Sequence, residues 1–136
     1  MPIESHHHVS VCVTDLERAK EFYGDVLGLA EIRRPAFSFP GAWYEVGDWQ
    51  LHLIVHTTPR ALRGTTEIDG RDGHFAFRVR DYQATVDYLR SRGVPFRENP
   101  RNPTPWAQVY VTDPDGNVIE FNVERSRDSF EAEMGT

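Results

Sequence analysis

The chain contains one cysteine, Cys12, among its 136 residues. A single cysteine cannot form an internal disulfide, so a disulfide-stapled fold is excluded, and such sparing use favours a reducing compartment. No run approaches the roughly 18 apolar residues that a membrane-crossing helix needs. The N-terminal residues also lack the apolar segment of a signal peptide. We therefore expect a cytoplasmic protein without a membrane partner.

Positive charge is also scarce, because 15 Lys and Arg residues face 21 Asp and Glu residues, for a net charge of −6. Nucleic acids and anionic membranes favour a basic surface, so a nucleic-acid partner is not expected. The chain is 39% hydrophobic and 12% aromatic, which is typical of a globular protein. Its length suits one domain with a buried core. We expect a single domain over residues 1–136.

The sequence pattern occurs twice along the chain. Each half opens with alternating polar and apolar residues, HVSVCV from residue 8 and HFAFRV from residue 74. This alternation predicts a strand with one apolar face, and it places His8 and His74 on the opposite face. Each histidine lies seven residues before an aspartate, Asp15 or Asp81. The two halves therefore predict two similar modules.

Each opening strand precedes a helix and further strands. The first helix is predicted over LERAKEFYGDVLG, with Thr14 or Asp15 as the N-cap and Gly28 as the stop, and the second over DYQATVDYLRSRG, ending at Gly93. Turn residues separate WYEV from QLHLIV and AQVYVTD from NVIEFNV, which predicts two hairpins. Residues 35–41 should form a further strand or an irregular approach, and residues 98–105, rich in proline, a loop.

The predicted fold class is α+β, with two tandem βαβββ modules. Module 1 covers about residues 5–56, a linker about 57–73, and module 2 about 74–124. The tail at 125–136 is polar and weakly patterned, which favours a frayed end or a short helix. If both modules fold in this way, their sheets can curl together around a shared concave side.

Four potential metal ligands occupy matching positions in the two halves. His8 and His74 are 66 residues apart (74 − 8), and His52 and Glu120 are 68 apart (120 − 52). Strand parity places all four on the polar faces, so they can converge in the concave side. Three imidazoles and a carboxylate suit a divalent ion such as Zn, Ni, Co, Fe or Mn. The sequence therefore predicts a metal site without identifying the metal.

Each of these residues also has a plainer interpretation. An isolated strand histidine usually lies on the surface or makes a core hydrogen bond, but the repeat argues against this for His8 and His74. Glu120 lies between apolar residues, and an unpaired buried carboxylate is costly, so a cation is the expected partner. His52 could instead lie beside the metal without binding it. The other histidines, which have no counterpart in the repeat, are expected bystanders: His6, His7 and His56.

Several segments resemble the vicinal oxygen chelate superfamily, which includes glyoxalase I, fosfomycin-resistance transferases, extradiol dioxygenases and bleomycin-resistance proteins. The matching segments are HVSVCVTDLERAKEFYGDVLGL, LHLIVH, GHFAFRVRD and DPDGNVIEF, and with their spacing they cover about residues 5–124. The resemblance implies paired βαβββ modules that form a curled mixed sheet around a divalent metal, usually in a homodimer. It places the ligands at His8, His52, His74 and Glu120.

The segments FYGDVLGL, IRRP, FPGAW and LHLI are most similar to the glyoxalase I-like branch. Glyoxalase I isomerises the hemithioacetal of glutathione and a 2-oxoaldehyde. The resemblance implies a lactoylglutathione lyase-like enzyme in which Glu120 is the catalytic base and the metal stabilises an enediolate. Three positions depart from the family's glutathione contacts, namely Cys12, His56 and Gly70, and His52 replaces a usual Glu. The pattern thus predicts the reaction centre better than the substrate.

Other activities on this scaffold stay open. His8, His74 and Glu120 match a fosfomycin-type thiol transferase, with Ser10 and Tyr110 at its site positions, and the same three could hold iron in an extradiol dioxygenase. A non-catalytic, ligand-sequestering dimer is a further alternative. The candidate substrate contacts for a small molecule are Ser10, Trp43, Arg101 and Tyr110. Core packing of the tryptophan and solvation of the arginine are the plainer interpretations.

Overall fold

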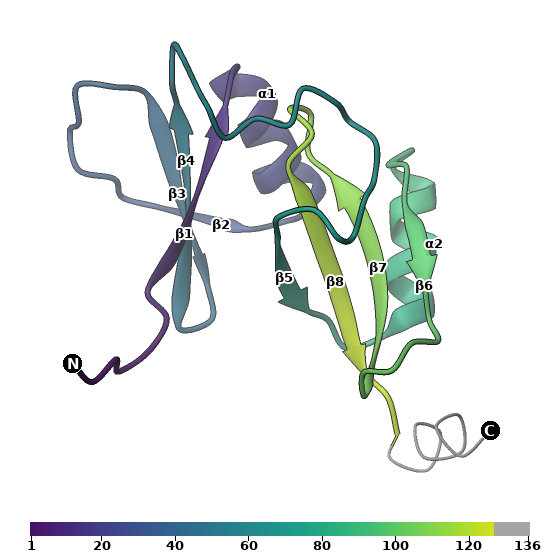
Figure 1. Ribbon diagram of the computed structural model, residues 1–136. Helices are drawn as coiled ribbons and strands as arrows, with labels where there is room; N and C mark the ends of the chain where they lie inside the picture. The colour runs from purple at the N-terminus through teal and green to yellow at the C-terminus, as the bar shows by residue number, and fades with distance from the viewer. Residues whose placement is uncertain (127–136) are drawn as a thin grey trace. The chain divides into compact units, whose positions relative to one another are not determined.

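The two halves of the chain fold into the same succession of elements, a strand, a helix and three strands (Figure 1). The computed structural model describes residues 1–126, so all but the first two residues of the expected tail lie outside the described part. The chain divides into an N-terminal unit, residues 1–64, and a C-terminal unit from residue 65 onward. This division falls inside the predicted linker at 57–73.

The elements confirm the α+β class and the two tandem βαβββ modules. Those of the N-terminal unit are β1 (His8–Val13), α1 (Leu16–Lys20) continued by η1 (Glu21–Val26), β2 (Ala30–Ile32), β3 (Gly41–Val46) and β4 (Trp49–Val55). Those of the C-terminal unit are β5 (His74–Arg78), α2 (Tyr82–Ser91), β6 (Arg97–Asn99), β7 (Trp106–Thr112) and β8 (Val118–Glu124). Within residues 1–126, no helix is both long and apolar enough to span a bilayer.

The strands form two open, mixed four-stranded sheets, in the orders β1-β4-β3-β2 and β5-β8-β7-β6. In each sheet the opening strand runs parallel to the last one, and the other pairs are antiparallel. The register sets Ser10 and Trp43 on either side of His52, and Ala76 and Tyr110 on either side of Glu120. Equivalent strands therefore present the predicted ligands in equivalent surroundings.

Burial alternates as predicted in β1 and β5, whereas in β4 and β8 the predicted ligands are buried as well. The apolar residues that alternate with the predicted ligands form the core of each unit: Val11, Val13, Leu51 and Leu53 in the first, and Phe77, Ile119 and Phe121 in the second. Ala19, Phe22 and Tyr23 complete the first core from the helix, and Val86 and Leu89 complete the second. Each sheet thus has one helix-covered apolar face and one face that carries polar side chains.

The first helix differs from the single α-helix that its pattern predicts. It begins at Leu16, where the Asp15 side chain accepts from the Arg18 backbone N–H at 3.1 Å, so Asp15 and not Thr14 is the N-cap. From Glu21 onward it widens into a π-helix. A π turn holds one more residue than an α turn, and the adjacent Phe22 and Tyr23 are both buried. The second helix has Asp81 as its N-cap and stops before Gly93, as expected.

The segment predicted as a linker packs against the C-terminal sheet. The Thr112 hydroxyl donates to the Thr66 carbonyl at 3.1 Å, and Arg97 Nη1 donates to the Ile68 carbonyl at 2.7 Å. The Tyr110 ring lies against Gly70. Sequence reasoning did not predict this packing, and it also missed β2 and β6, each of which has only three residues. Residues 33–40 form no strand, so the irregular alternative holds there.

The turn between β7 and β8 is held by a buried aspartate. Asp113 is 2% exposed, and its Oδ1 accepts from the backbone N–H groups of Asp115 and Asn117, both at 2.9 Å. Its Oδ2 accepts from Asn117 Nδ2 at 2.8 Å. Gly116 has φ 89°, and a Cβ there would collide with the Thr65 carbonyl oxygen. This turn fixes the register that brings Tyr110 opposite Glu120.

Replacing Asp113 by alanine should destabilise the protein by about 2–4 kcal/mol, because two backbone donors and one amide lose their buried acceptor. Urea unfolding of wild type and Asp113→Ala measures the difference. Asp87→Ala, at an exposed position on α2, should change the free energy of unfolding by no more than about 0.5 kcal/mol. Equal stability of the two variants would contradict the role given to this turn.

Stability should also fall at alkaline pH. Burial, with a smaller effect of Glu31, raises the pKa of Tyr44 to about 12, and burial followed by Glu120 raises that of Tyr110 to about 12. In the unfolded chain both phenols ionise near 10, so above that pH the unfolded state binds fewer protons than the folded state. The free energy of unfolding should therefore decrease from about pH 10 to about pH 12. Urea unfolding at several pH values, with tyrosinate absorbance recorded alongside, measures this; phenols that ionise near 10 in the folded protein would contradict it.

Candidate functional site

The four predicted ligands are divided equally between the two units. His8 and His52 belong to the N-terminal unit, and His74 and Glu120 belong to the C-terminal unit. Within either unit, residues 1–126 contain no group of three or more His, Cys, Asp or Glu side chains that could hold a metal ion. Each unit thus offers two ligands, and the four-ligand set stays a prediction.

His74 and Glu120 converge in the C-terminal unit. His74 Nε2 lies 3.3 Å from Glu120 Oε1, and His74 Nδ1 lies 2.8 Å from the Asp72 carbonyl oxygen. A carbonyl only accepts, so Nδ1 carries a proton, and Nε2 is the ring nitrogen that faces the carboxylate. A proton or a metal ion between Nε2 and Oε1 makes this contact favourable.

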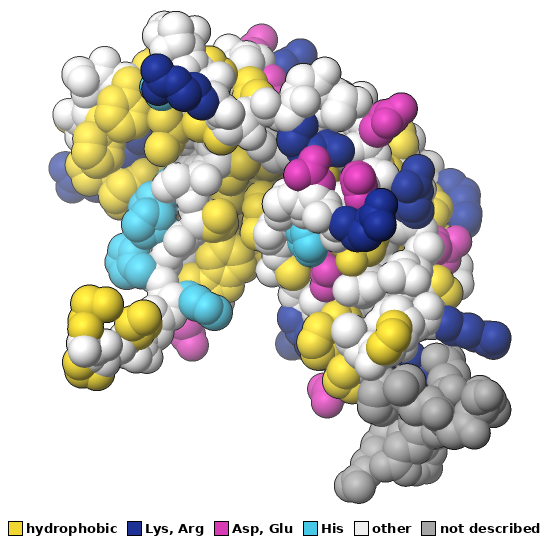
Figure 2. Space-filling view, in the orientation of Figure 1, with side chains coloured by type: hydrophobic (Ala, Val, Ile, Leu, Met, Phe, Trp, Pro, Cys, Tyr) yellow, Lys and Arg dark blue, Asp and Glu magenta, His cyan; other side chains and the backbone are white. Residues whose placement is uncertain are grey.

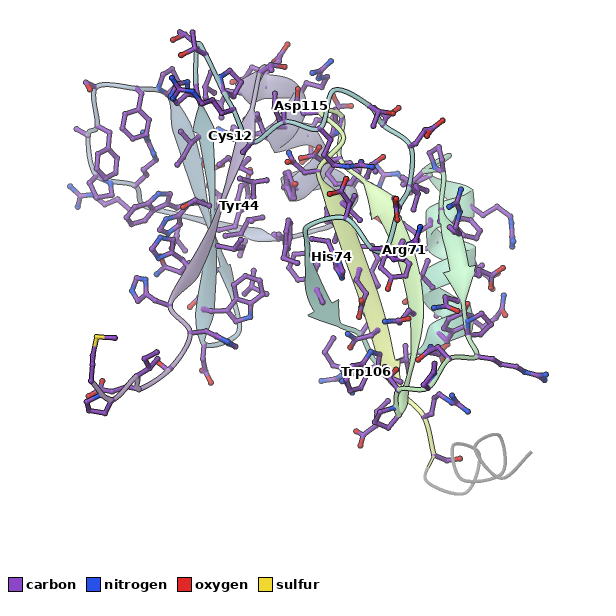
Figure 3. All side chains as sticks on the ribbon, in the orientation of Figure 1. Cys12, Tyr44, Arg71, His74, Trp106 and Asp115 are labelled. Atoms are coloured by element: carbon purple, nitrogen blue, oxygen red, sulfur yellow. The ribbon has the colours of Figure 1, made fainter. Side chains whose placement is uncertain are left out.

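The spacing of these two atoms fits a shared metal ion. Ligand atoms at about 2.1 Å from one metal, at angles between tetrahedral and right angles, lie roughly 3.0–3.4 Å apart. The observed 3.3 Å falls in that range. The backbone carbonyl of Asp72 orients the imidazole in the way that the outer partners of metal-binding histidines usually do. This half of the site therefore fits the metal that the sequence predicts. His74 is labelled in Figure 3.

Three neutral donors surround the Glu120 carboxylate, which is 5% exposed. Gln108 Nε2 and the Tyr110 hydroxyl each donate to Oε1 at 3.1 Å, and Asn122 Nδ2 donates to Oε2 at 2.6 Å. These bonds offset the cost of burying a charge and fix the orientation of the side chain. They come from β7 and β8, whose register pairs Tyr110 with Glu120 and Gln108 with Asn122.

Tyr110 acts as a donor because its proton is firmly held. Burial first, and then Glu120, raises its pKa to about 12, so the hydroxyl stays protonated near neutral pH. Its ring meets that of His74 edge to face at a centroid distance of 5.6 Å. A Cβ at position 70 would lie 2.8 Å from Tyr110 Cζ. Gly70, which stands where glyoxalase I usually has an arginine, is therefore required for the position of this ring.

In the N-terminal unit, His52 is enclosed between two rings. Its imidazole stacks on Trp43 at a centroid distance of 3.9 Å and on His8 at 4.2 Å. The side chain is 6% exposed, and burial, with smaller effects of His8, His7 and Arg34, lowers its pKa to about 4. His52 is therefore neutral at physiological pH, and the neutral imidazole is the form that binds metals.

The nitrogens of these histidines already have partners. His52 Nε2 lies 2.8 Å from Gln50 Oε1, and His7 Nδ1 lies 2.7 Å from His8 Nδ1. A metal bound through the same nitrogens would replace these hydrogen bonds. The N-terminal pair is therefore less prepared for a metal than His74 and Glu120, and whether His52 is a ligand stays a prediction.

Three of the four candidate substrate residues lie beside a predicted ligand. Trp43 stacks on His52, Ser10 is exposed on β1 in register with His52, and Tyr110 donates to Glu120. Arg101 is exposed on the loop that precedes β7. This strand begins at Trp106, which lies four residues before Tyr110. Three of the four therefore lie beside a predicted ligand of their own unit. Arg101 instead lies before the first residue of β7.

Several contacts of the predicted ligands were not predicted from the sequence. Strand parity places Gln50 and Asn122 on the faces of His52 and Glu120, but it does not predict their hydrogen bonds to these two residues. Gln108 follows from the hairpin register with Asn122. The contact of His7 with His8 and the role of the Asp72 main-chain carbonyl have no such signal. His7, predicted as a bystander, in fact contacts a predicted ligand.

Exposed aromatic side chains lie close to the enclosed histidine. Phe37 and Phe39 are 46% and 39% exposed and stack on each other, and Phe37 also meets Trp43 at 6.0 Å. The Arg34 guanidinium lies over both phenylalanine rings. Figure 2 shows hydrophobic and histidine side chains on one face of the N-terminal unit. An apolar contact surface therefore adjoins the Trp43–His52 stack.

Known proteins resemble this chain in sequence and in fold. A lactoylglutathione lyase from Neisseria meningitidis is 31% identical over 126 residues, which cover 89% of this chain and 91% of the relative. A glyoxalase family protein from Bacillus anthracis has a similar structure, with a TM-score of 0.77 at 27% identity, covering 92% of this chain and 98% of its own. An antibiotic binding protein from Streptomyces has a TM-score of 0.69 at 30% identity, covering 91% and 98%.

The family model of the Glyoxalase/Bleomycin resistance protein/Dioxygenase superfamily matches residues 5–121. That range includes module 1, all but the last residues of module 2 and all four predicted ligands, and the resemblance inferred from the sequence is thereby confirmed. The chain belongs to the Glyoxalase/Bleomycin resistance protein/Dioxygenase superfamily.

Proposed function

We propose that the protein is a metal-dependent, glyoxalase I-like lyase that isomerises a small oxygenated substrate of the 2-oxoaldehyde type. His8, His52, His74 and Glu120 would hold the metal. The observation that carries the proposal is the approach of His74 Nε2 to Glu120 Oε1 at 3.3 Å, with Nδ1 held by a carbonyl. Family membership and the lactoylglutathione lyase from Neisseria support the same activity.

A bound divalent ion would supply positive charge that stabilises negative charge on substrate oxygens. The chain supplies the base. Glu120 Oε1 lies beside His74, whereas Oε2 accepts one described hydrogen bond, from Asn122. We assign proton transfer to Oε2, which takes a proton from one substrate carbon and returns it to the neighbouring carbon. No atom is gained or lost, so the net reaction is an isomerisation.

The neutral donors position this base. Tyr110 and Gln108 hold Oε1 from β7, and both are uncharged, so they orient the carboxylate without neutralising it. The stacked Trp43, with Phe37 and Phe39 nearby, offers the apolar part of a substrate surface. Because Cys12, His56 and Gly70 replace the usual glutathione contacts, we assign the carbonyl chemistry to this site and leave the thiol of the substrate unassigned. We also propose a cytoplasmic homodimer, as the family resemblance implies.

A second candidate is non-catalytic ligand sequestration. The antibiotic binding protein from Streptomyces, at 30% identity, favours it. The exposed rings of Phe37 and Phe39 beside Trp43 suit a flat apolar ligand, since offset stacking contributes to binding. This function needs the aromatic surface and does not need a base at position 120.

Metal content and activity test the proposal together. Protein loaded with Ni²⁺, Zn²⁺ or Co²⁺ and then dialysed should retain a divalent ion, and His74→Ala should weaken metal binding at least about tenfold. Glu120→Gln should lower kcat/KM by about 10²-fold or more with the hemithioacetal of methylglyoxal and glutathione, because it removes the base. Elemental analysis and the initial rate of thioester formation measure the two effects.

His6→Ala is the matched control, because His6 is exposed and has no counterpart in the repeat, and it should leave both quantities unchanged. Wild type that retains no metal would refute the proposal. If Glu120→Gln binds the ligand as tightly as the wild type does, and the wild type does not turn the ligand over, the result would favour non-catalytic ligand sequestration. Oxygen uptake with a catechol, or thiol addition to an epoxide, would instead indicate the dioxygenase or the transferase.

Gly70 should influence the base only through Tyr110. Tyr110→Phe removes one donor to Glu120 and should lower kcat by about three- to tenfold. Gly70→Ala should cause a similar loss, since the added methyl group displaces the ring from Glu120. In the Tyr110→Phe background, Gly70→Ala should then have little further effect on kcat. A double-mutant cycle of kcat measures the coupling, and additive losses would contradict it.

A further inference from the structure

The N-terminal unit contains a second concave site, on the opposite side of its sheet from the predicted ligands. Tyr44 follows Trp43 on β3, so the two side chains point to opposite faces, and Trp43 is the one that stacks on His52. A groove of about 650 Å³ opens on the Tyr44 side, between this strand and the helix. That volume is typical of sites for small molecules.

The lining of the groove is strongly acidic. Five of its ten lining residues are Asp or Glu, and two are Arg or Lys. Of the basic residues, Lys20 pairs with Glu31 at 3.3 Å, and Arg18 Nη2 donates to the Thr14 hydroxyl at 3.1 Å. The carboxylates therefore outnumber the cations, and the groove should attract a positively charged ligand.

A buried hydroxyl at the base of the groove lacks a partner. Tyr44 is 1% exposed, and its hydroxyl oxygen has no hydrogen bond within residues 1–126. Gly24 lines the same groove, and a Cβ there would lie 3.6 Å from that oxygen, in ordinary contact with it. A buried hydroxyl without a partner is costly and uncommon. This second observation, independent of the charge, points to a ligand.

Carboxylates that line the groove act on the same hydroxyl. Burial first, and then Glu31, Asp25 and Glu17 in that order, raise the pKa of Tyr44 to about 12. The phenol is therefore protonated near neutral pH, and its oxygen can accept a hydrogen bond from a cationic N–H group. Asp25 and Gly24 both come from the π-helical turn, a feature that is frequent at functional sites.

The arrangement favours an organic cation over a metal ion. Within residues 1–126, no three carboxylates gather closely enough to hold a metal. The charges are instead spread over a groove large enough for an extended molecule. We propose that this groove binds an organic ion with two or more ammonium groups, one of which donates to Tyr44 Oη while the others pair with carboxylates such as Asp25 and Glu31. The site is separate from the proposed metal centre.

Calorimetry with spermidine as the probe, at physiological ionic strength, tests this proposal on the full chain. One equivalent should bind, and Tyr44→Phe should weaken the binding by about three- to tenfold, because it removes only the acceptor. Asp25→Asn should weaken it by a similar factor through the loss of one charge. His74→Ala should bind spermidine as wild type does, which separates this site from the metal centre.

Asp87→Asn is the matched control for charge, because it removes one exposed carboxylate from α2 in the other unit and should leave the Kd unchanged. Thermal unfolding should show that Tyr44→Phe is folded, since the variant keeps the buried ring. Equal binding by Tyr44→Phe and wild type would overturn the proposal. So would an equal weakening by Asp87→Asn, or displacement of spermidine by Mg²⁺ at the same concentration.

Discussion

The C-terminal unit is organised around one buried carboxylate, Glu120. A charge with 5% exposure is tolerated only where donors or cations surround it, and three side chains from two strands donate to this one. The pairing of β7 with β8, the turn at Asp113 and the glycine at position 70 all contribute to that arrangement. Much of the unit's geometry therefore follows from satisfying this group.

Much of the fold follows from the alternation of polar and apolar residues and from the residues that cap and end the helices. The valines of β1 and the phenylalanines of β5 are inward, as a period of two predicts. Asp15 and Asp81 cap their helices, and Gly28 and Gly93 adopt the positive φ that ends them. The repeat located His74 and Glu120, which the structure brings together. These features depend on neighbouring residues, so local pattern is enough to predict them.

Local sequence pattern did not predict three other features, two of them local and one between residues distant in sequence. The sequence of the π-helical turn at Glu21–Val26 predicts an ordinary α-helix, because its apolar residues recur at nearly α-helical spacing. The approach of Gly70 to Tyr110 joins residues that are 40 positions apart (110 − 70). The hydrogen bond from His74 to the Asp72 carbonyl involves the main chain, which every residue shares. Such contacts become visible only when the chain is folded.

The first residues of the C-terminal unit, 65–70, have a constraint on their length. Thr65 lies against the turn glycine Gly116, and Gly70 lies against the ring of Tyr110. The path from one contact to the other is therefore fixed by the sheet that it crosses, and an inserted or deleted residue there would displace the aromatic donor of the buried carboxylate. Insertions and deletions in homologous chains that keep this tyrosine should then accumulate in residues 57–64, upstream of the first contact, and be rare at 65–70.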